Sequence, residues 1–289
     1  MRRQWRTSQC TAVVLAQACR LVCSGLKERS MKRQHGMRNP GIASVVAGMV
    51  VALVLTLGAA AAGVSAAEFS EAELFFELND TDGDLGIHAS IDGGPYVVLE
   101  IEDPDGRTIL RVTAQGRLAR QGLTQLFLES AEPSFDELAP EEFFRRFPEG
   151  VYDIEAETLE GQEFKSKVKL SHVLAAPPSN IRVAGIPAAE NCDPVALPSV
   201  PVGAPVTIDW DPVKKSHPTI GKSGAVNIVR YQFFVEQGDL KLGVDLPPTV
   251  TEFQVPPAII ALGGTFKFEI IARTATRNNT AVENCFVVE

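Results

Sequence analysis

The stretch GVYDIEAETLEGQEFKSKVKL, residues 150–170, decides the fold class of this chain. It contains two runs in which every second residue would face the same side of an extended strand, a period of two that is typical of β-structure. The residues of that shared face are Tyr152, Ile154 and Ala156, followed by Phe164, Ser166, Val168 and Leu170. Glu160-Gly161 lies between the runs and provides a turn, so the stretch predicts a β-hairpin.

Strand patterns continue on the N-terminal side of this hairpin. Five short apolar-rich or alternating segments precede it: Glu73–Leu78, Gly86–Ile91, Tyr96–Ile101, Thr108–Val112 and Leu123–Leu128. Turn sequences follow two of them, Asp92-Gly93-Gly94 and Asp103-Pro104-Asp105-Gly106. In the latter, proline presets φ and glycine permits a positive φ. We therefore expect this part of the chain to be dominated by strands.

One segment departs from the strand pattern, SFDELAPEEFFRRF at residues 134–147. Ser134 and Glu137 have the spacing of a capping box, which predicts a helical turn, and Pro140 suits the first position of a second short helix. Three aromatic residues of this segment would share one apolar face: Phe143, Phe144 and Phe147. We expect this face to cover an open end of the sheet rather than to bind a partner.

The second half of the chain resembles a fibronectin type III domain over most of its length. Five segments carry the resemblance: Pro177–Val183 (PPSNIRV), Val206–Pro212 (VTIDWDP), Tyr231–Glu236 (YQFFVE), Thr251–Val255 (TEFQV) and Phe266–Ala272 (FKFEIIA). Trp210 matches the core tryptophan of that family. Phe266 matches its corner tyrosine but lacks the hydroxyl group, so a hydrogen bond worth on the order of 1 kcal/mol must be replaced elsewhere.

The first half resembles the last hairpin of bacterial immunoglobulin-like modules, in the phrase Pro148-Glu149-Gly150-Val151-Tyr152 and the strands that follow. Together the two resemblances imply an exported bacterial all-β protein with two tandem β-sandwich domains. We place the immunoglobulin-like domain, with its helical insert, at residues 67–175 and the fibronectin type III-like domain at residues 176–289. The linker AAPPSN at residues 175–180 contains two prolines, which favour an extended connection.

An uncharged apolar run, Ile42–Ala62, precedes both domains. Nine Lys and Arg residues lie before it, which is typical of a secretory signal, and the small residues Val64-Ser65-Ala66 suit a cleavage site. An uncleaved transmembrane anchor is the alternative, since about 20 residues can span a bilayer. In both cases residues 67 onward would be extracytoplasmic, either periplasmic or secreted. Residues 1–36 are too long for the short basic region that begins a signal, so translation could start at Met31 or Met37 instead of Met1.

Charge and cysteine content restrict the function of the part after residue 66. Of the 27 Lys+Arg and 36 Asp+Glu residues, nine and one lie in residues 1–66, which leaves a net charge of −17 on the remainder. This charge disfavours nucleic acid and anionic lipid as partners. Two cysteines remain, Cys192 and Cys285, and an even pair outside the cytoplasm predicts a disulfide. Its loop of roughly 90 residues is worth about 4–5 kcal/mol in the chain-entropy model.

The clearest chemical motif is the acidic turn Asn79-Asp80-Thr81-Asp82-Gly83-Asp84. Three alternating carboxylates, Asp80, Asp82 and Asp84, are oxygen ligands of the type that Ca²⁺ prefers. The motif is not an EF-hand, because the glycine falls at the fourth loop position instead of the sixth. Acidic turns also form without any metal, so a calcium site and a plain turn both stay open.

No catalytic motif stands out in the sequence. His88, His172 and His217 fall on different expected elements, and no G-x-S-x-G is present. We expect a non-enzymatic binding, adhesion or scaffold protein that contacts protein or glycan at the cell envelope without a cofactor. The alternatives are a calcium-stabilised module and an accessory module for extracellular polysaccharide processing. The lysine-rich segment Lys214–Gly224 could be a recognition loop or a plain connector.

Overall fold

The computed structural model describes residues 66–189, 192 and 195–289. The expected signal or anchor at 42–62 and the alternative start residues lie outside these ranges. Within them, no helix is both long enough and apolar enough to cross a membrane. The described residues belong to one compact unit by their contacts.

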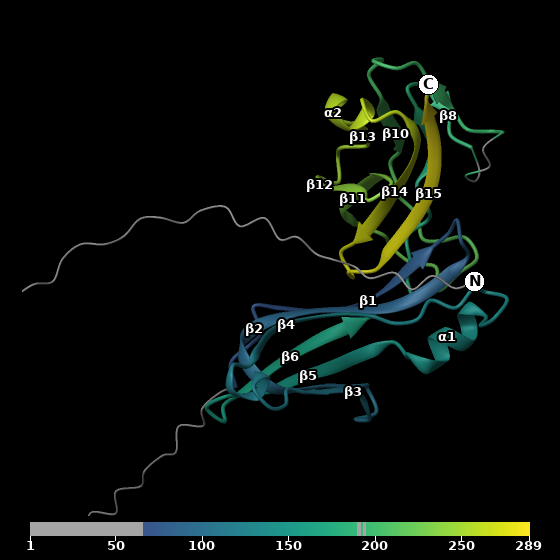
Figure 1. The fold of residues 1–289 in the computed structure, drawn as a ribbon. Helices are drawn as coiled ribbons and strands as arrows, with labels where there is room; N and C mark the ends of the chain where they lie inside the picture. Colours follow the sequence, from purple (N-terminus) through teal and green to yellow (C-terminus); the bar gives the residue numbers. More distant parts are fainter. Residues whose placement is uncertain (1–65, 190–191, 193–194) are drawn as a thin grey trace, which may run out of the picture. The chain divides into compact units, whose positions relative to one another are not determined.

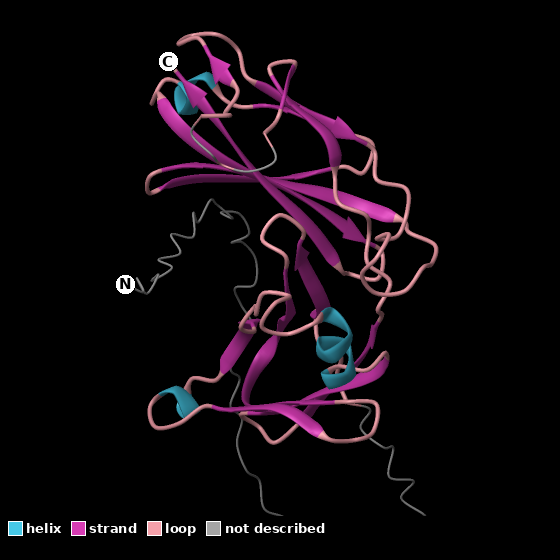
Figure 2. Cartoon of the chain, turned by 90° about the vertical axis from the view of Figure 1, so that its right-hand side faces the viewer, coloured by secondary structure: helices cyan, strands magenta, loops and turns pink. Residues whose placement is uncertain are grey.

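Strands dominate the described part of the chain (Figures 1 and 2). Those before residue 175 are β1 (Glu71–Asn79), β2 (Asp84–Glu102), β3 (Thr108–Thr113), β4 (Leu123–Glu129), β5 (Gly150–Thr158) and β6 (Glu163–Leu170). Those after it are β7 (Ser179–Val183), β8 (Ile186–Pro187), β9 (Ser199–Val200), β10 (Thr207–Asp211), β11 (Ile228–Gln237), β12 (Leu240–Leu246), β13 (Glu252–Gln254), β14 (Gly264–Thr274) and β15 (Asn279–Val288). The short helices are η1 (Leu118–Arg120), α1 (Pro140–Arg146) and α2 (Pro257–Ile260).

Two separate hydrophobic cores confirm the all-β, two-sandwich architecture. The buried members of the first core run from Phe69 to Leu174, and those of the second run from Ala175 to Val288. A four-stranded sheet in the order β13-β10-β7-β8 supplies inward residues to the second core, including Val183, Ile208 and Trp210. The facing residues come from β11, β14 and β15. This arrangement agrees with the fibronectin type III-like and immunoglobulin-like sandwich fold.

The hairpin that decides the fold class is present as β5 and β6, with Tyr152 opposite Val168. Tyr152 is fully buried, and its hydroxyl group donates a hydrogen bond to the carbonyl oxygen of Pro148 at 2.9 Å. A tyrosine that bonds back to the backbone a few residues upstream is the corner device of immunoglobulin-like sandwiches. The first sandwich therefore has the tyrosine corner that the second sandwich lacks.

In the second sandwich, aromatic packing stabilises the region that corresponds to the tyrosine corner of the first. Phe266 is fully buried and stacks on Phe286 with a centroid distance of 5.0 Å and an interplanar angle of 7°. Trp210 contacts the ring of Tyr231 edge-on at 5.4 Å, and the Tyr231 hydroxyl accepts a hydrogen bond from the backbone of Val213.

The helical insert is confirmed for its second half. Helix α1 begins at Pro140, and Phe143 and Phe144 pack edge-on against Phe76 in the first core. The helical turn expected at Ser134 is a single hydrogen-bonded turn, in which the amide groups of Glu137 and Leu138 donate to the Ser134 carbonyl oxygen.

The turn predicted at Asp92-Gly93-Gly94 is wrong. β2 runs without a break from Asp84 to Glu102, with register shifts between Asp92 and Tyr96. A Cβ atom on Gly93 would lie 2.9 Å from the ring of Phe69, and one on Gly94 would lie 2.9 Å from that of Phe164. These glycines therefore allow two aromatic rings to approach the bent strand closely, and they do not form a turn.

A parallel strand pair joins the two sandwiches. Strand β1 pairs with β15 through Glu77↔Asn279, Leu78↔Thr280 and Asn79↔Ala281. This pairing extends one sheet through both sandwiches, in the order β12-β11-β14-β15-β1-β2-β5-β6. The sequence pattern predicts two successive domains, and no local signal announces this long-range contact. The domain boundary at residues 175/176 stays a prediction as a statement about independent folding.

The predicted disulfide is confirmed: Cys192 and Cys285 are bonded, with their Cα atoms 5.0 Å apart. Cys285 lies on β15, opposite Lys267 of β14. The bond therefore connects the segment before β9 to a strand that also contacts the first sandwich.

We predict that replacing both cysteines, Cys192→Ser with Cys285→Ser, lowers the free energy of unfolding by about 2–5 kcal/mol, because the unfolded chain regains the entropy of an open loop. Urea unfolding of residues 66–289 measures this change. Treatment of the wild type with reductant should give the same decrease. Equal stability of the wild type and the double variant would contradict the prediction.

Candidate functional site

The acidic turn lies between β1 and β2, and its side chains are largely engaged with protein groups. Asn79 Oδ1 accepts hydrogen bonds from the backbone amides of Thr81 and Asp82 at 3.1 and 3.2 Å. Asp80 Oδ1 lies 2.9 Å from Nε2 of the buried His217. Because His217 Nδ1 accepts a hydrogen bond from the amide of Ile220, Nε2 carries the proton and donates it to Asp80. These contacts are those of a structured turn.

Asp84 has a different environment from the two carboxylates before it. Its Oδ1 atom is buried and has no hydrogen-bond partner within the described ranges. Burial, together with the charges of Glu132 and Asp82, raises the pKa of Asp84 to about 6. The calcium site at Asp80, Asp82 and Asp84 is not tested by these contacts and stays a prediction, which melting curves in Ca²⁺ and in EDTA would decide.

A second group of ligand-type side chains lies beside this turn, formed by Glu77, His88 and Glu132. One ligand atom of each lies within 4.8 Å of the others. His88 Nε2 and Glu132 Oε1 are 2.9 Å apart, and His88 is only 3% exposed. Burial alone would lower the pKa of His88, but the hydrogen bond to Glu132 and the charge of Glu77 raise it above its ordinary value.

Strand register brings these three residues together. Glu77 of β1 lies directly opposite Gly86 of β2, and His88 is the next residue on the same face of β2. Glu132 follows β4 and reaches across Gly86: a Cβ atom there would lie 2.5 Å from Glu132 Oε1. Gly86 therefore leaves the space that the Glu132 side chain occupies.

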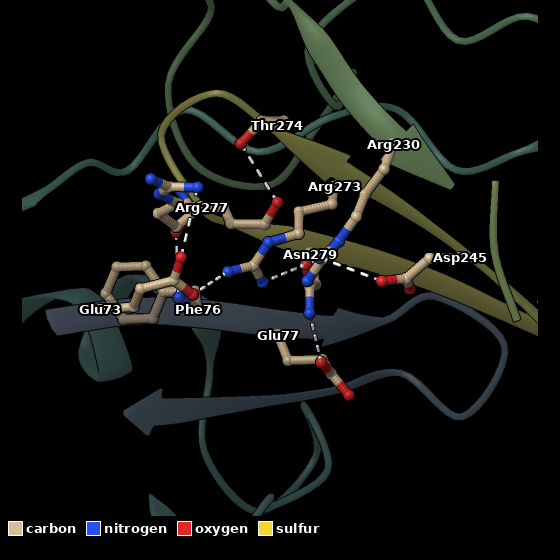
Figure 3. A network of polar contacts seen from close by, with 10 residues as sticks. Glu73, Phe76, Glu77, Arg230, Asp245, Arg273, Thr274, Arg277 and Asn279 are labelled. Atoms are coloured by element: carbon tan, nitrogen blue, oxygen red, sulfur yellow. Dashed lines mark hydrogen bonds and ion pairs between the residues drawn. The ribbon is translucent and has the colours of Figure 1, made fainter. Parts of the chain in front are cut away.

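A polar network continues from Glu77 into the second sandwich (Figure 3). Asn279 Nδ2 donates to Glu77 Oε2 at 2.7 Å, and Arg273 Nη1 donates to Asn279 Oδ1 at 3.1 Å. Arg273 also pairs with Glu73, and its guanidinium group lies 4.6 Å from the ring centroid of Phe75. Arg273 is 3% exposed, so its charge needs these partners.

Asn278 completes the connection between the sandwiches. It is fully buried, accepts a hydrogen bond from the amide of Phe76 at 3.0 Å, and donates to the carbonyl oxygens of Ser171 and Val173 at 2.7 and 3.1 Å. A buried side-chain amide with both of its polar atoms paired fixes the local geometry.

The lysine-rich segment Lys214–Gly224 packs against the first sandwich. The amide of His217 donates to the carbonyl oxygen of Leu174, that of Lys222 donates to His172, and Ile220 packs on the first core. Lys222 also pairs with Glu149. This segment therefore packs over the linker. Neither interpretation from the sequence, a recognition loop or a plain connector, predicts this role.

A third titratable group lies on the same sheet in the second sandwich. Burial raises the pKa of Glu269 to about 7, and the charges of Glu77 and Glu283 add to the rise. Lys241 and Lys267 oppose it, and Lys267 is itself paired with Glu283. Glu269 thus changes its charge near neutral pH.

The three histidines in the described part of the chain are each engaged by a different group. His88 contacts Glu132 and His217 contacts Asp80, while His172 Nε2 lies 2.9 Å from the carbonyl oxygen of Phe147. Sequence reasoning treats His88 as structural and does not single out Glu77 or Glu132. His88 follows the inward-facing Ile87 along β2, so its side chain lies on the other face of the strand. No local pattern in the sequence connects His88 to Glu132, which is 44 positions away.

No family model matches the sequence, and no curated protein sequence matches it. A two-domain fibronectin type III segment of chicken tenascin is 13% identical, with 76% of this chain and 98% of that segment covered and a TM-score of 0.25. A cytokine receptor complex is 13% identical, covering 73% and 91% with a TM-score of 0.24. A bacterial ice-binding adhesin is 9% identical, covering 78% and 66% with a TM-score of 0.24. At such TM-scores these likenesses carry no argument about function.

We predict that stability decreases as pH rises through about 7. A buried carboxyl group whose pKa is raised in the folded state holds a proton that the unfolded chain releases above about 4.5, so its contribution is full at low pH and is lost as pH rises through the folded pKa. Glu269→Gln removes this loss, and at pH 8 its melting temperature should exceed that of the wild type by roughly 3–8 °C.

Thermal melting from pH 5 to pH 8.5 in EDTA measures this effect. The difference between the two curves should shrink towards pH 5 and vanish below about pH 4.5, where the unfolded chain also holds the proton. A constant difference between wild type and variant across the whole range would show that Glu269 is not responsible.

Proposed function

We propose that this chain is a non-catalytic binding module whose partner is a protein and whose contact surface is centred on strand β4. The observation that carries the proposal is the exposure of Phe127. Its side chain is 58% exposed, and no other aromatic residue in the described part of the chain is as open to solvent. A large apolar side chain that remains in water on a folded protein is a frequent anchor of protein interfaces.

The position of Phe127 in the sheet supports this proposal. Within the described ranges, β4 pairs with β2 alone, so its other edge has no strand partner. Free edges present unpaired amide and carbonyl groups, to which an extended segment of another protein can add as a new strand. Phe127 would then fill a pocket of the partner beside this backbone pairing.

The charge and the aromatic content of this surface indicate the chemistry of the partner. Glu129 is exposed on the same strand face as Phe127, and Glu132 follows it. An acidic surface of this kind favours a partner segment with basic residues. Flat glycan-binding faces usually carry several exposed aromatic rings, whereas the described chain exposes one, which favours protein over polysaccharide.

The disulfide supports a location outside the cytoplasm, since such bonds persist in oxidising compartments. An envelope adhesin or scaffold with a rigid pair of sandwiches fits these features. The calcium-stabilised and polysaccharide-accessory functions remain alternatives with no specific observation in their favour.

We predict that linear peptides selected from a displayed random library against residues 66–289 lose affinity for Phe127→Ser by about tenfold or more, because a central aromatic anchor contributes about 2 kcal/mol. Titration calorimetry with the selected peptides measures the change. The matched control is Leu262→Ser, which removes a side chain that is 50% exposed in the second sandwich. Selection of no peptide above background, or equal affinity for wild type and Phe127→Ser, would contradict the proposal.

A further inference from the structure

The cluster of Glu77, His88 and Glu132 combines the donor types of a transition-metal site. Imidazole nitrogen and carboxylate oxygen together suit Zn²⁺ and its neighbours, whereas Ca²⁺ prefers six to eight oxygen ligands. We propose that Glu77, His88 and Glu132 bind one divalent transition-metal ion of the zinc class at the point where β1 joins the two sandwiches. None of these three ligands belongs to the acidic turn, which borders the site at Asp84, and the proposal does not depend on the protein partner proposed above.

The distances fit an ion after small side-chain movements. Two donors on a tetrahedral zinc ion, each about 2.0–2.2 Å from the metal, lie about 3.4 Å from one another. His88 Nε2 and Glu132 Oε1 are 2.9 Å apart, and all three donor atoms lie within 4.8 Å. Closing the set around the buried His88 requires the two carboxylates to move by rotation of their side chains.

The surroundings of the cluster are those of a prepared site. Asn279 donates a hydrogen bond to Glu77 Oε2 at 2.7 Å, which leaves the other carboxylate oxygen for an ion. Hydrogen bonds of this type orient the ligands of protein metal sites. Gly86 provides the space in which Glu132 lies, since any larger residue would collide with its carboxylate.

Asp84 supplies a further argument for a ligand at this position. Its buried Oδ1 has no hydrogen-bond partner within the described ranges, and the negative charge of Glu132 acts on it. A buried, unpaired carboxylate oxygen beside two other carboxylates is costly unless a cation is shared.

A bound ion would strengthen the connection between the sandwiches. Glu77 belongs to β1, and its partner Asn279 belongs to β15 of the second sandwich. An ion that binds only the folded protein stabilises it in proportion to the logarithm of its concentration over Kd. Loss of the ion would therefore lower the stability of the folded chain.

The test is titration of residues 66–289, stripped with EDTA and free of any histidine tag, with ZnCl₂ by calorimetry. We expect one Zn²⁺ per chain, and a Kd at least about tenfold weaker in His88→Gln and in Glu132→Gln. The matched control is His217→Gln, which removes another buried histidine paired with a carboxylate, Asp80, that belongs to no such three-residue group within the described ranges. Its Kd should stay within about twofold of the wild type.

The Glu77→Gln variant keeps the proposal testable if the His88→Gln variant does not fold. A glutamine at this position keeps an oxygen that can accept from Asn279 but removes the negative charge, so it should weaken zinc binding while the circular dichroism spectrum is unchanged. No saturable zinc binding, unchanged affinity in all three site variants, or equal loss in His217→Gln would overturn the proposal. The proposal would also be overturned if CaCl₂ bound as tightly as ZnCl₂ and the same substitutions weakened its binding equally, since the donor set would then not select for a transition metal.

Discussion

The connection between the two sandwiches depends on one buried side chain, that of Asn278. Its amide group accepts from the backbone of β1 and donates to two carbonyl oxygens of the segment that leads out of the first sandwich. Because a buried amide is costly when unpaired, these three hydrogen bonds hold the β14–β15 hairpin in one position. Asn279, the next residue, is thereby placed beside Glu77 and within reach of Arg273.

Other contacts act together with these hydrogen bonds. The parallel β1–β15 pairing, the Arg273–Glu73 ion pair and the packing of Ile220 on the first core all act across the same boundary. His88 and the exposed Phe127 are ring neighbours at 6.2 Å, so the metal cluster and the proposed contact surface of β4 share one face of the sheet.

Local patterns in the sequence account for much of the fold. Alternation predicts the hairpin around Tyr152, the position of α1 follows from Pro140, and cysteine count predicts the disulfide. The failures have physical causes. The sequence around Gly93 and Gly94 has the composition of a turn. The aromatic rings that these glycines accommodate, those of Phe69 and Phe164, belong to residues far away in the sequence and leave no local pattern. The β1–β15 pairing and the approach of Glu132 to His88 also join residues that no local period connects, so neither the joint nor the metal cluster is visible in the sequence.

Calorimetric unfolding of residues 66–289 tests the central claim most directly, with Asn278→Ala as the comparison. If the sandwiches form one cooperative unit, the wild type will unfold in a single transition whose calorimetric and van't Hoff enthalpies agree, and Asn278→Ala will separate it into two. Two independent transitions in the wild type, unchanged in the variant, would contradict the account.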